Sequence, residues 1–190
     1  MQILVGLGNP GAQYALNRHN VGFIAIDAIA ARWSLGPFRP RFQGLAAEGR
    51  IGTAKLLLLK PATFMNDSGR SVGEALRFFK AEAASALTVF YDELDLAPFK
   101  LRIKHGGGAA GHNGIRSLDA HIGADYRRVR IGIGHPGQKE RVTGHVLGNF
   151  AKAEMAPLAD LIGVMADELP TLLAGDEARY LSDVALRLQA

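Results

Sequence analysis

The sequence predicts a single three-layer α/β/α domain over residues 1–190, with a mixed, mostly parallel central sheet and C-terminal helices. Two observations predict this class. Short apolar runs of strand length alternate along the chain with segments whose apolar residues recur at helical spacing. Two of the runs, residues 45–50 and 54–60, follow each other too closely for a helical crossover. They therefore predict an antiparallel hairpin within the sheet.

The first apolar run, residues 3–5, ends in glycines and predicts a buried strand. Apolar residues return at helical spacing from Val21, with Ile24, Ala25 and Ala28, which predicts a helix. Because α/β folds place ligands at the ends of their strands, the intervening loop is the first candidate for a functional site. That loop carries a set of polar residues, Asn9, Asn17, Arg18, His19 and Asn20.

The middle of the chain continues the alternation. Residues 56–59 are four leucines in succession, which is typical of a strand covered on both faces. Pro61 ends this strand, and a helical pattern begins a few residues later. Either Asn66 or Asp67 would be a suitable N-cap for that helix, because short polar side chains accept hydrogen bonds from the first free amides.

A third buried strand, residues 87–91, runs directly into Asp92. A carboxylate at the end of a buried strand is well placed to orient a catalytic histidine. A glycine-rich segment at residues 105–114 predicts a loop that is either flexible or closely approaches a phosphate. The other elements that we expect are strands at 99–104 and 127–134, a short helix from Ile115, and helices within 152–188.

Composition limits the classes of function. The chain is 48% hydrophobic and 21% charged, as in ordinary globular proteins. It has no cysteine, which excludes disulfides, thiolate catalysis and cysteine-ligated metals. No apolar run is long enough to span a membrane and no signal peptide is visible, so we expect a cytoplasmic protein that does not contact membranes. The net charge of +4 suits a partner rich in phosphate.

Three glycines imitate a nucleotide-binding motif. Gly6, Gly8 and Gly11 match G-x-G-x-x-G, but that motif requires a helix to open at the loop with its amides facing a pyrophosphate. Here Pro10 and the polar residues after it delay the helix to about Asn20. A simple tight turn explains the glycines better, because glycine tolerates positive φ. A dinucleotide-dependent oxidoreductase stays open as an alternative function.

The remaining motifs favour base-catalysed hydrolysis. The chain has no nucleophilic serine motif, no P-loop and no H-E-x-x-H metal motif. A histidine general base could instead activate water, given a carboxylate to orient it and amide side chains to fix the reacting carbonyl. His19 and Asp92 supply the first pair, and Asn9, Asn66 and Asn113 supply the amides. Base catalysis contributes typically about 10²–10⁴-fold, which suits an activated ester better than an amide.

Taken together, these residues resemble one known family. The chain is similar to bacterial-type peptidyl-tRNA hydrolase over nearly its whole length, in four stretches at residues 5–11 with 18–23, 60–69, 92–96, and 111–114 with 130–136. The resemblance implies an enzyme that cleaves the ester between a peptide, or an N-blocked aminoacyl group, and the 3′ ribose of tRNA. It also implies that this activity recycles tRNA from prematurely released peptidyl-tRNA. We expect no metal and no cofactor, and a cytoplasmic monomer.

The resemblance also implies roles for individual residues. His19 would accept the proton of the attacking water, Asp92 would orient His19, and Asn9 would distinguish N-blocked from free aminoacyl-tRNA. Lys104 and Arg130 would hold the 5′ phosphate of the tRNA, whose acceptor stem and 3′ end the enzyme binds. The remaining matched residues would line the substrate cleft, namely Tyr14, Phe64, Met65, Asn66, His112 and Asn113.

One departure from the family pattern lies in the glycine-rich loop. Ala109 and Ala110 stand where the family often has more polar residues or glycines, which puts the flexibility of the loop in doubt. A non-catalytic RNA-binding module is a further alternative function. It would need exposed aromatic residues among its basic ones for base stacking, and aromatics make up only 7% of this chain.

Overall fold

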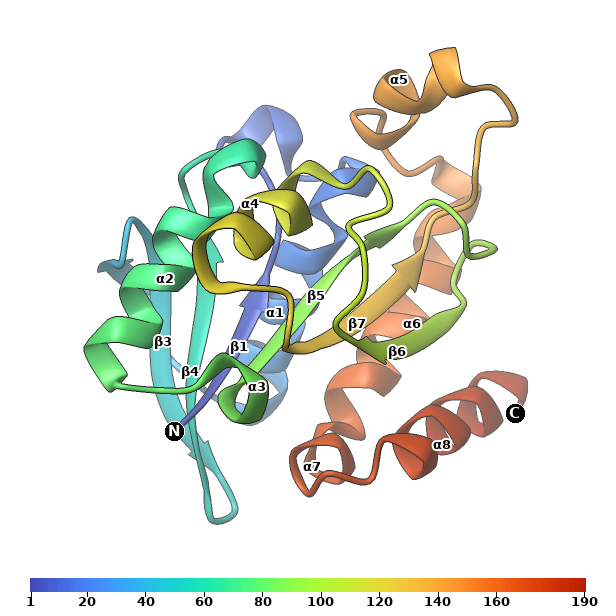
Figure 1. Cartoon of the computed structure of the whole chain (residues 1–190). Coiled ribbons are helices and arrows are strands. Elements are labelled where there is room, and N and C mark those ends of the chain that lie inside the picture. The colour runs from blue at the N-terminus through green and yellow to red at the C-terminus, as the bar shows by residue number, and fades with distance from the viewer.

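A computed structural model describes residues 1–190 and contains one seven-stranded sheet of order β2-β3-β4-β1-β5-β7-β6 (Figure 1). The strands are β1 (Gln2–Gly6), β2 (Arg39–Arg41), β3 (Gly44–Ile51), β4 (Ala54–Pro61), β5 (Leu87–Glu93), β6 (Leu101–His105) and β7 (Arg127–Gly132). The four central strands β4, β1, β5 and β7 are parallel. Both edges are antiparallel, through the β3–β4 hairpin with β2 and through β6. The predicted mixed sheet is confirmed.

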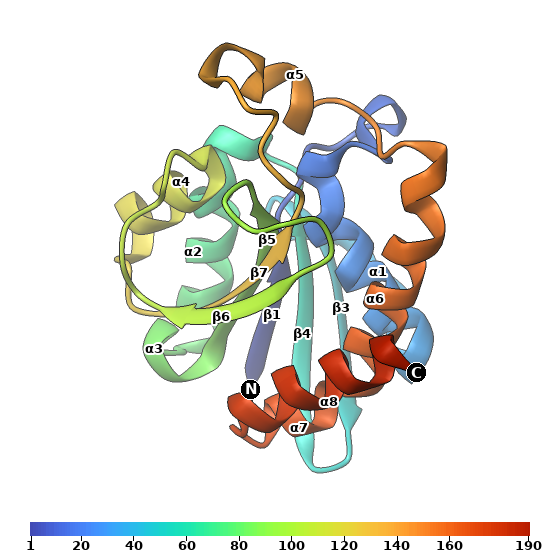
Figure 2. The ribbon, with the colours of Figure 1, turned by 90° about the vertical axis from the view of Figure 1, so that its right-hand side faces the viewer.

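Helices cover both faces of the sheet, which gives the predicted three layers (Figure 2). They are α1 (Val21–Trp33), α2 (Ser68–Phe79), α3 (Ala83–Ala86), α4 (Asn113–Ile122), α5 (Val142–Val146), α6 (Met155–Asp167), α7 (Leu169–Leu173) and α8 (Glu177–Gln189). One face carries α2 and α4, and the other carries α1 and α6. The short helix α5 stands beyond the carboxyl ends of the central strands (Figure 2).

The core is divided by the sheet into two apolar clusters. Successive side chains of β1 alternate between them, as the period of a strand requires. Leu4 packs with Val21 of α1 in the larger cluster, which also holds residues of α6 and α8. Ile3 and Val5 pack on the opposite face, in the cluster that includes residues of α2 and α4. The buried runs expected at residues 3–5, 56–59 and 87–91 lie at the centre of this sheet.

Two glycines allow α1 to lie directly against the sheet. A Cβ atom on Gly6 would collide with the carbonyl oxygen of Gly22, and one on Gly22 would collide with the carbonyl oxygen of Phe90. Neither glycine has a positive φ. The prediction that a tight turn requires glycine at Gly6 and Gly8 is therefore wrong. Gly6 is needed for the close backbone contact, and Gly8 makes room for the ring of Phe23.

The structure differs from the sequence-based elements in a few places. The strand β2 and the short helices α3 and α5 were not predicted. Of the two residues expected to cap α2, Asp67 occupies the N-cap position, but its side chain makes no capping hydrogen bond. The prediction is wrong for Asn66, which lies in the 3₁₀ turn Met65–Asp67 before the helix. The turn leaves the Asn66 side chain beside a cavity instead.

None of the helices combines the length and the apolar character that crossing a membrane requires.

Candidate active site

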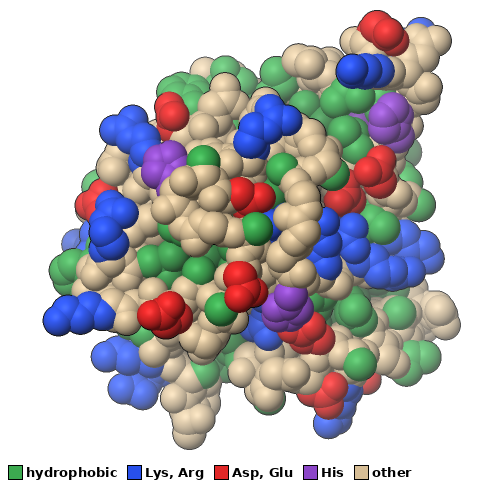
Figure 3. Space-filling model, in the orientation of Figure 1, with side chains coloured by type: hydrophobic (Ala, Val, Ile, Leu, Met, Phe, Trp, Pro, Cys, Tyr) green, Lys and Arg blue, Asp and Glu red, His purple; other side chains and the backbone are tan.

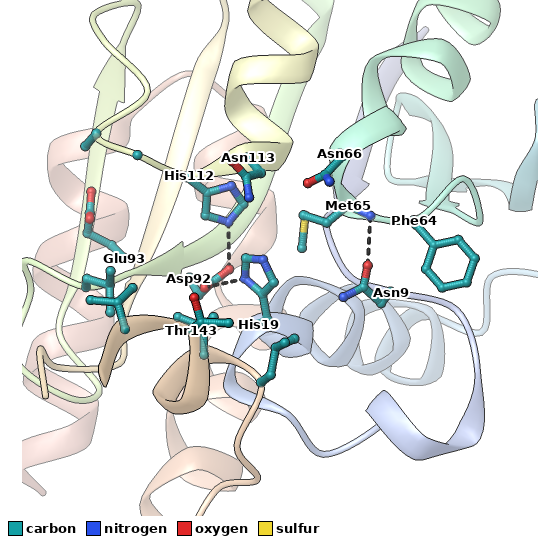
Figure 4. Close-up of a pocket in the computed structure, with 16 residues that line it drawn as sticks. Asn9, His19, Phe64, Met65, Asn66, Asp92, Glu93, His112, Asn113 and Thr143 are labelled. Atoms are coloured by element: carbon teal, nitrogen blue, oxygen red, sulfur yellow. Dashed lines mark hydrogen bonds and ion pairs between the residues drawn. The ribbon is translucent and has the colours of Figure 1, made fainter. Parts of the chain in front are cut away.

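A cavity of about 410 Å³ lies at the carboxyl ends of β1 and β5 (Figure 4). Loops from distant parts of the chain bound it: the loop after β1, the loop after β4, the end of β5, the glycine-rich loop before α4, and α5. Eight residues expected in the active site line it, namely Asn9, His19, Phe64, Met65, Asn66, Asp92, His112 and Asn113. Three do not, namely Tyr14, Lys104 and Arg130.

The closest pair of ionisable groups in this cavity is His19 and Asp92. His19 belongs to the 3₁₀ turn Arg18–Asn20 that leads into α1, and its Nδ1 lies 2.7 Å from Asp92 Oδ2. Burial disfavours the charge of Asp92, but the two adjacent histidines and their hydrogen bonds outweigh this and hold its pKa well below the ordinary range. Asp92 is therefore an ionised acceptor. His19 donates Nδ1–H to it, which leaves the Nε2 lone pair free to accept a proton.

His112 contacts the other oxygen of the same carboxylate. Its Nε2 lies 2.8 Å from Asp92 Oδ1, and the side chain of His112 is only 8% exposed. Its Nδ1 accepts hydrogen bonds from the backbone amides of Gly114 and Ile115, at 3.1 and 3.2 Å, so that His112 caps α4. Ligand atoms of His19, Asp92 and His112 lie within 4.8 Å of one another, a donor set seen in metal sites. In this structure the three side chains are hydrogen-bonded to one another, His19 to one Asp92 oxygen and His112 to the other.

Asn9 is held by its backbone and by its side chain. Asn20 forms two hydrogen bonds of 2.9 Å with the backbone of Asn9, one with its N–H and one with its carbonyl. The Asn9 Oδ1 accepts from the backbone N–H of Met65 at 2.8 Å, so its Nδ2 is the atom left to donate into the cavity (Figure 4). We had noted Asn20 only as a polar residue of this loop. Its contact with Asn9 depends on how the loop folds, and the sequence carries no signal for it.

Phe64, Asn66 and Asn113 lie around the cavity opposite Asp92 (Figure 4). The Phe64 ring is 55% exposed and packs edge-on against Tyr14, with 6.4 Å between ring centroids. Tyr14 therefore supports a wall of the cavity from outside. Asn113 begins α4, and its Oδ1 accepts from Arg116 at 3.3 Å, which leaves its amide nitrogen free. The two asparagines thus bring amide groups to the side of the cavity that faces His19.

The fifth wall of the cavity is α5, which the sequence did not reveal because five residues are too few for a periodic signal. The segment that follows α5 is bound to the loop that carries His19. The backbone N–H of Arg18 donates to Gly148 at 2.9 Å, and the Arg18 guanidinium pairs with Glu154 at 2.8 Å. The side chains of Asn17 and Asn149 bond at 2.8 Å. The residues that α5 and its C-terminal end add to the lining are Val142, Thr143, Val146 and Leu147.

Lys104 and Arg130 lie outside the cavity, on the β6–β7 edge of the sheet, where basic side chains gather (Figure 3). The register of the two strands places Arg102 opposite Arg130, and Lys104 opposite Arg128. Arg130 contacts only Glu93, at 3.5 Å, and Lys104 contacts only the Gly108 carbonyl, at 3.3 Å. Like charges directly opposite each other destabilise a sheet, and here carboxylates offset part of the charge, Asp119 beside Arg128 and Glu93 beside Arg130.

Arg128 differs from its basic neighbours because it is fully buried. It bonds the Gly108 carbonyl at 2.9 Å, the Asp119 carboxylate at 3.0 Å and the Ala124 carbonyl at 3.2 Å. It thereby holds the glycine-rich loop against α4. In that loop Ala110 has a φ of 49°, so one of the two alanines that depart from the family pattern occupies a backbone conformation that favours glycine.

Comparisons with known proteins identify the family of this chain. The family model for peptidyl-tRNA hydrolase matches residues 3–188. The chain is 65% identical over 188 residues to a peptidyl-tRNA hydrolase of Rhizorhabdus wittichii, with 99% of each chain covered. It is 63% identical to one of Novosphingobium aromaticivorans, over 100% of this chain and 98% of the relative.

A solved structure gives the same result for the fold. The crystal structure of peptidyl-tRNA hydrolase from Acinetobacter baumannii superimposes with a TM-score of 0.90 at 39% identity, over 97% of this chain and 94% of that one. Sequence and structure thus agree over nearly the whole length. The chain belongs to the peptidyl-tRNA hydrolase family, and it hydrolyses peptidyl-tRNA.

Proposed function

We propose that His19 is the general base of this hydrolysis and that Asp92 orients it. The observation that carries the proposal is the 2.7 Å contact between His19 Nδ1 and the buried carboxylate of Asp92, at the edge of the cavity. The contact fixes the ring and its tautomer, so that Nε2 is the nitrogen that accepts a proton. A carboxylate in this position also stabilises the imidazolium that forms when the proton arrives.

The reaction then needs no nucleophile from the protein. Water forms a bond to the ester carbonyl carbon while His19 Nε2 takes one of its protons. The carbonyl electrons move to the oxygen, and they return as the bond from carbon to the ribose 3′ oxygen breaks. His19 returns the proton to that leaving oxygen, and the products are a free carboxylic acid and tRNA. No step requires a metal or a cofactor.

The amide side chains hold the substrate in this scheme. The free Nδ2 of Asn9 points into the cavity beside His19, where it can donate to the carbonyl of an N-acyl group. A free aminoacyl-tRNA has a positively charged amine at that point and offers no such acceptor. Asn9 thus selects N-blocked substrates, while Asn66 and Asn113 bind the ester and the peptide, and Phe64, Met65 and His112 line the cleft.

The tRNA lies outside the cavity, along the β6–β7 edge. Lys104 and Arg130 hold its 5′ phosphate, which places the acceptor stem beside the sheet and the 3′ end in the cavity. The incompletely paired cations of this edge support the assignment. We further infer that residues 1–190 act as a single domain and as a monomer in the cytoplasm. There the enzyme returns tRNA to translation after premature release.

Replacement of His19 by alanine tests the proposal. We expect His19→Ala to lower kcat for N-acetyl-aminoacyl-tRNA by about 10²–10⁴-fold, the contribution of a general base. His121→Ala is the matched control, because His121 is an exposed histidine that does not line the cavity. Substantial activity in His19→Ala would refute the base role. Loss of wild-type activity on treatment with a chelator alone would refute the metal-free scheme.

A further inference from the structure

We propose that His112 is a positioning residue: it fixes the Asp92 carboxylate from the side opposite His19 and keeps His19 available as a proton acceptor. The inference rests on the proposed role of His19 and extends it. It assigns His112 a part in setting the base, where the family resemblance implied only a place in the lining of the cleft.

The hydrogen bonds of His112 determine which of its nitrogens carries the proton. A backbone amide can only donate, and two of them, from Gly114 and Ile115, point at His112 Nδ1. This nitrogen must therefore be an unprotonated acceptor. A neutral ring then has its proton on Nε2, which lies 2.8 Å from Asp92 Oδ1 and donates to it. Protonation of Nδ1 would break both bonds at the amino end of α4, where the helix dipole also disfavours added positive charge.

Asp92 consequently accepts from two imidazoles at once. His19 approaches one carboxylate oxygen at 2.7 Å and His112 the other at 2.8 Å, with 4.9 Å between the ring centroids. The permanent donor on His112 satisfies part of the negative charge of the carboxylate. The attraction that Asp92 exerts on a protonated His19 is weakened by the same amount. The Nε2 of His19 therefore remains available to accept a proton from water.

The other charged groups near these residues are each neutral or paired elsewhere. On β5, burial raises the pKa of Tyr91 to about 12, so its ring against His112 is uncharged. Glu93 on the same strand pairs with Arg130 of β7. The remaining cations, Arg128 and Arg18, pair with Asp119 and Glu154. Asp92 and His112 are thus the ionisable groups in direct contact with His19.

The same contacts connect the base to the substrate-binding amides. His112 caps α4, and Asn113 is the first residue of that helix. The carboxylate that orients His19 therefore also fixes the start of the helix that presents Asn113. His112 in this way sets the distance between the proton acceptor and one of the groups that hold the ester.

Two variants separate the capping role of His112 from its contact with Asp92. His112→Asn keeps a favourable N-cap but is too short to donate to Asp92. His112→Gln places a donor near the position of Nε2 but is a poor cap. We expect the acid midpoint of the kcat/KM profile to rise by roughly half a unit to one unit in His112→Asn, the equivalent of one hydrogen bond. In His112→Gln we expect the same acid midpoint of kcat/KM as in the wild type, even if the variant is less stable. A wild-type midpoint in His112→Asn would overturn the proposal.

A spectroscopic measurement on the wild-type enzyme tests the tautomer without substrate. In protein labelled with ¹⁵N-histidine, we expect His112 to show a protonated Nε2 and an unprotonated Nδ1, with its signals identified by their loss in His112→Asn. A proton on Nδ1 would overturn the proposal even if His19→Ala is inactive. High activity in His19→Ala would instead refute the base role, whatever the tautomer of His112.

Discussion

The side chain of Asn20 forms hydrogen bonds with both backbone polar groups of Asn9. Its Oδ1 accepts from the Asn9 N–H at 2.9 Å, and its Nδ2 donates to the Asn9 carbonyl at 2.9 Å. Asn20 is 2% exposed, so no water can replace these bonds. Asn9 in turn bonds Met65 and directs its free amide into the cavity. Asn20 thus supports the residue that we propose selects N-blocked substrates, without lining the cavity itself.

Substitution of Asn20 should consequently reduce both stability and activity. Asn20→Asp keeps the acceptor for the Asn9 amide but puts a carboxylate oxygen against the Asn9 carbonyl. We expect a loss of about 2 kcal/mol in the free energy of unfolding, since one buried hydrogen bond is lost and the Asn9 carbonyl is left without a donor. A displacement of Asn9 by about an ångström would cost on the order of 10²-fold in kcat/KM. Urea unfolding and hydrolysis of N-acetyl-aminoacyl-tRNA measure the two effects, and normal turnover would show that Asn9 needs no such support.

Asp92 should make stability depend on acid pH. Its pKa is lowered in the folded state, so its stabilising contribution is fully present above the unfolded value of about 4 and is lost as pH falls toward the folded value. Asp92→Asn lacks this contribution, because one amide oxygen cannot accept from both His19 and His112. We expect the wild type to be more stable than Asp92→Asn at neutral pH, with a difference that shrinks below about pH 4. Urea midpoints across this range test the sign, and a gap that widens in acid would contradict it.

Arg128 should be essential for the stability of the glycine-rich loop. Arg128→Met removes a fully buried cation that donates to Asp119 and to two carbonyls. The Asp119 carboxylate then keeps only the hydroxyl of Tyr126 as a donor, and the Ala124 carbonyl loses its side-chain donor. We expect a loss of about 3 kcal/mol or more in the free energy of unfolding, as for other broken buried ion pairs. Amide hydrogen exchange at residues 106–111 should become faster. Arg116→Met is the matched control, because Arg116 is an exposed arginine of α4. Equal effects of the two variants would show that Arg128 does not stabilise the glycine-rich loop.

The basic edge should recognise a terminal phosphate. We expect Lys104→Gln and Arg102→Gln to weaken tRNA binding and to reduce the salt slope of log K by about one each. The diagnostic comparison uses tRNA with a 5′ phosphate or a 5′ hydroxyl. Removal of the phosphate should weaken binding to the wild type but change binding to Lys104→Gln much less. Lys55→Gln, at the far β3–β4 hairpin, should behave as the wild type does. If removal of the 5′ phosphate weakens binding to Lys104→Gln as much as it weakens binding to the wild type, Lys104 does not contact the phosphate.

The elements that local pattern determines were predictable from the sequence. The strand at residues 3–5, the leucine run of β4 and the β3–β4 hairpin follow from apolar period and spacing, and the structure confirms them. The residue types around the cavity were predictable too, because loops after parallel strands meet at one edge of a sheet. That His19 lies against Asp92 follows from this rule, although the sequence alone gives no distance.

The rest depends on contacts that only the folded chain creates. Arg128 was indistinguishable from the exposed basic residues around it, since burial beside Asp119 is a tertiary property. The expected side-chain cap of α2 is absent because a 3₁₀ turn, which has no periodic signal, precedes the helix and contains both Asn66 and the N-cap residue Asp67. The helix α5 is too short to show a pattern. His112 looked like part of the lining because its bonds to α4 and Asp92 cannot be inferred from spacing.

The backbone contacts at Gly6, Gly22 and Phe90 have a consequence for how the catalytic geometry tolerates change. Asn9, His19 and Asp92 each lie within three residues of one of these contact points, where main chain meets main chain with no side chain between. Their spacing is thus limited by the close approach of main-chain atoms at these contact points. One methyl group added at position 22 would collide with backbone atoms of both Leu7 and Phe90, and it would therefore force apart the segments that carry these three residues.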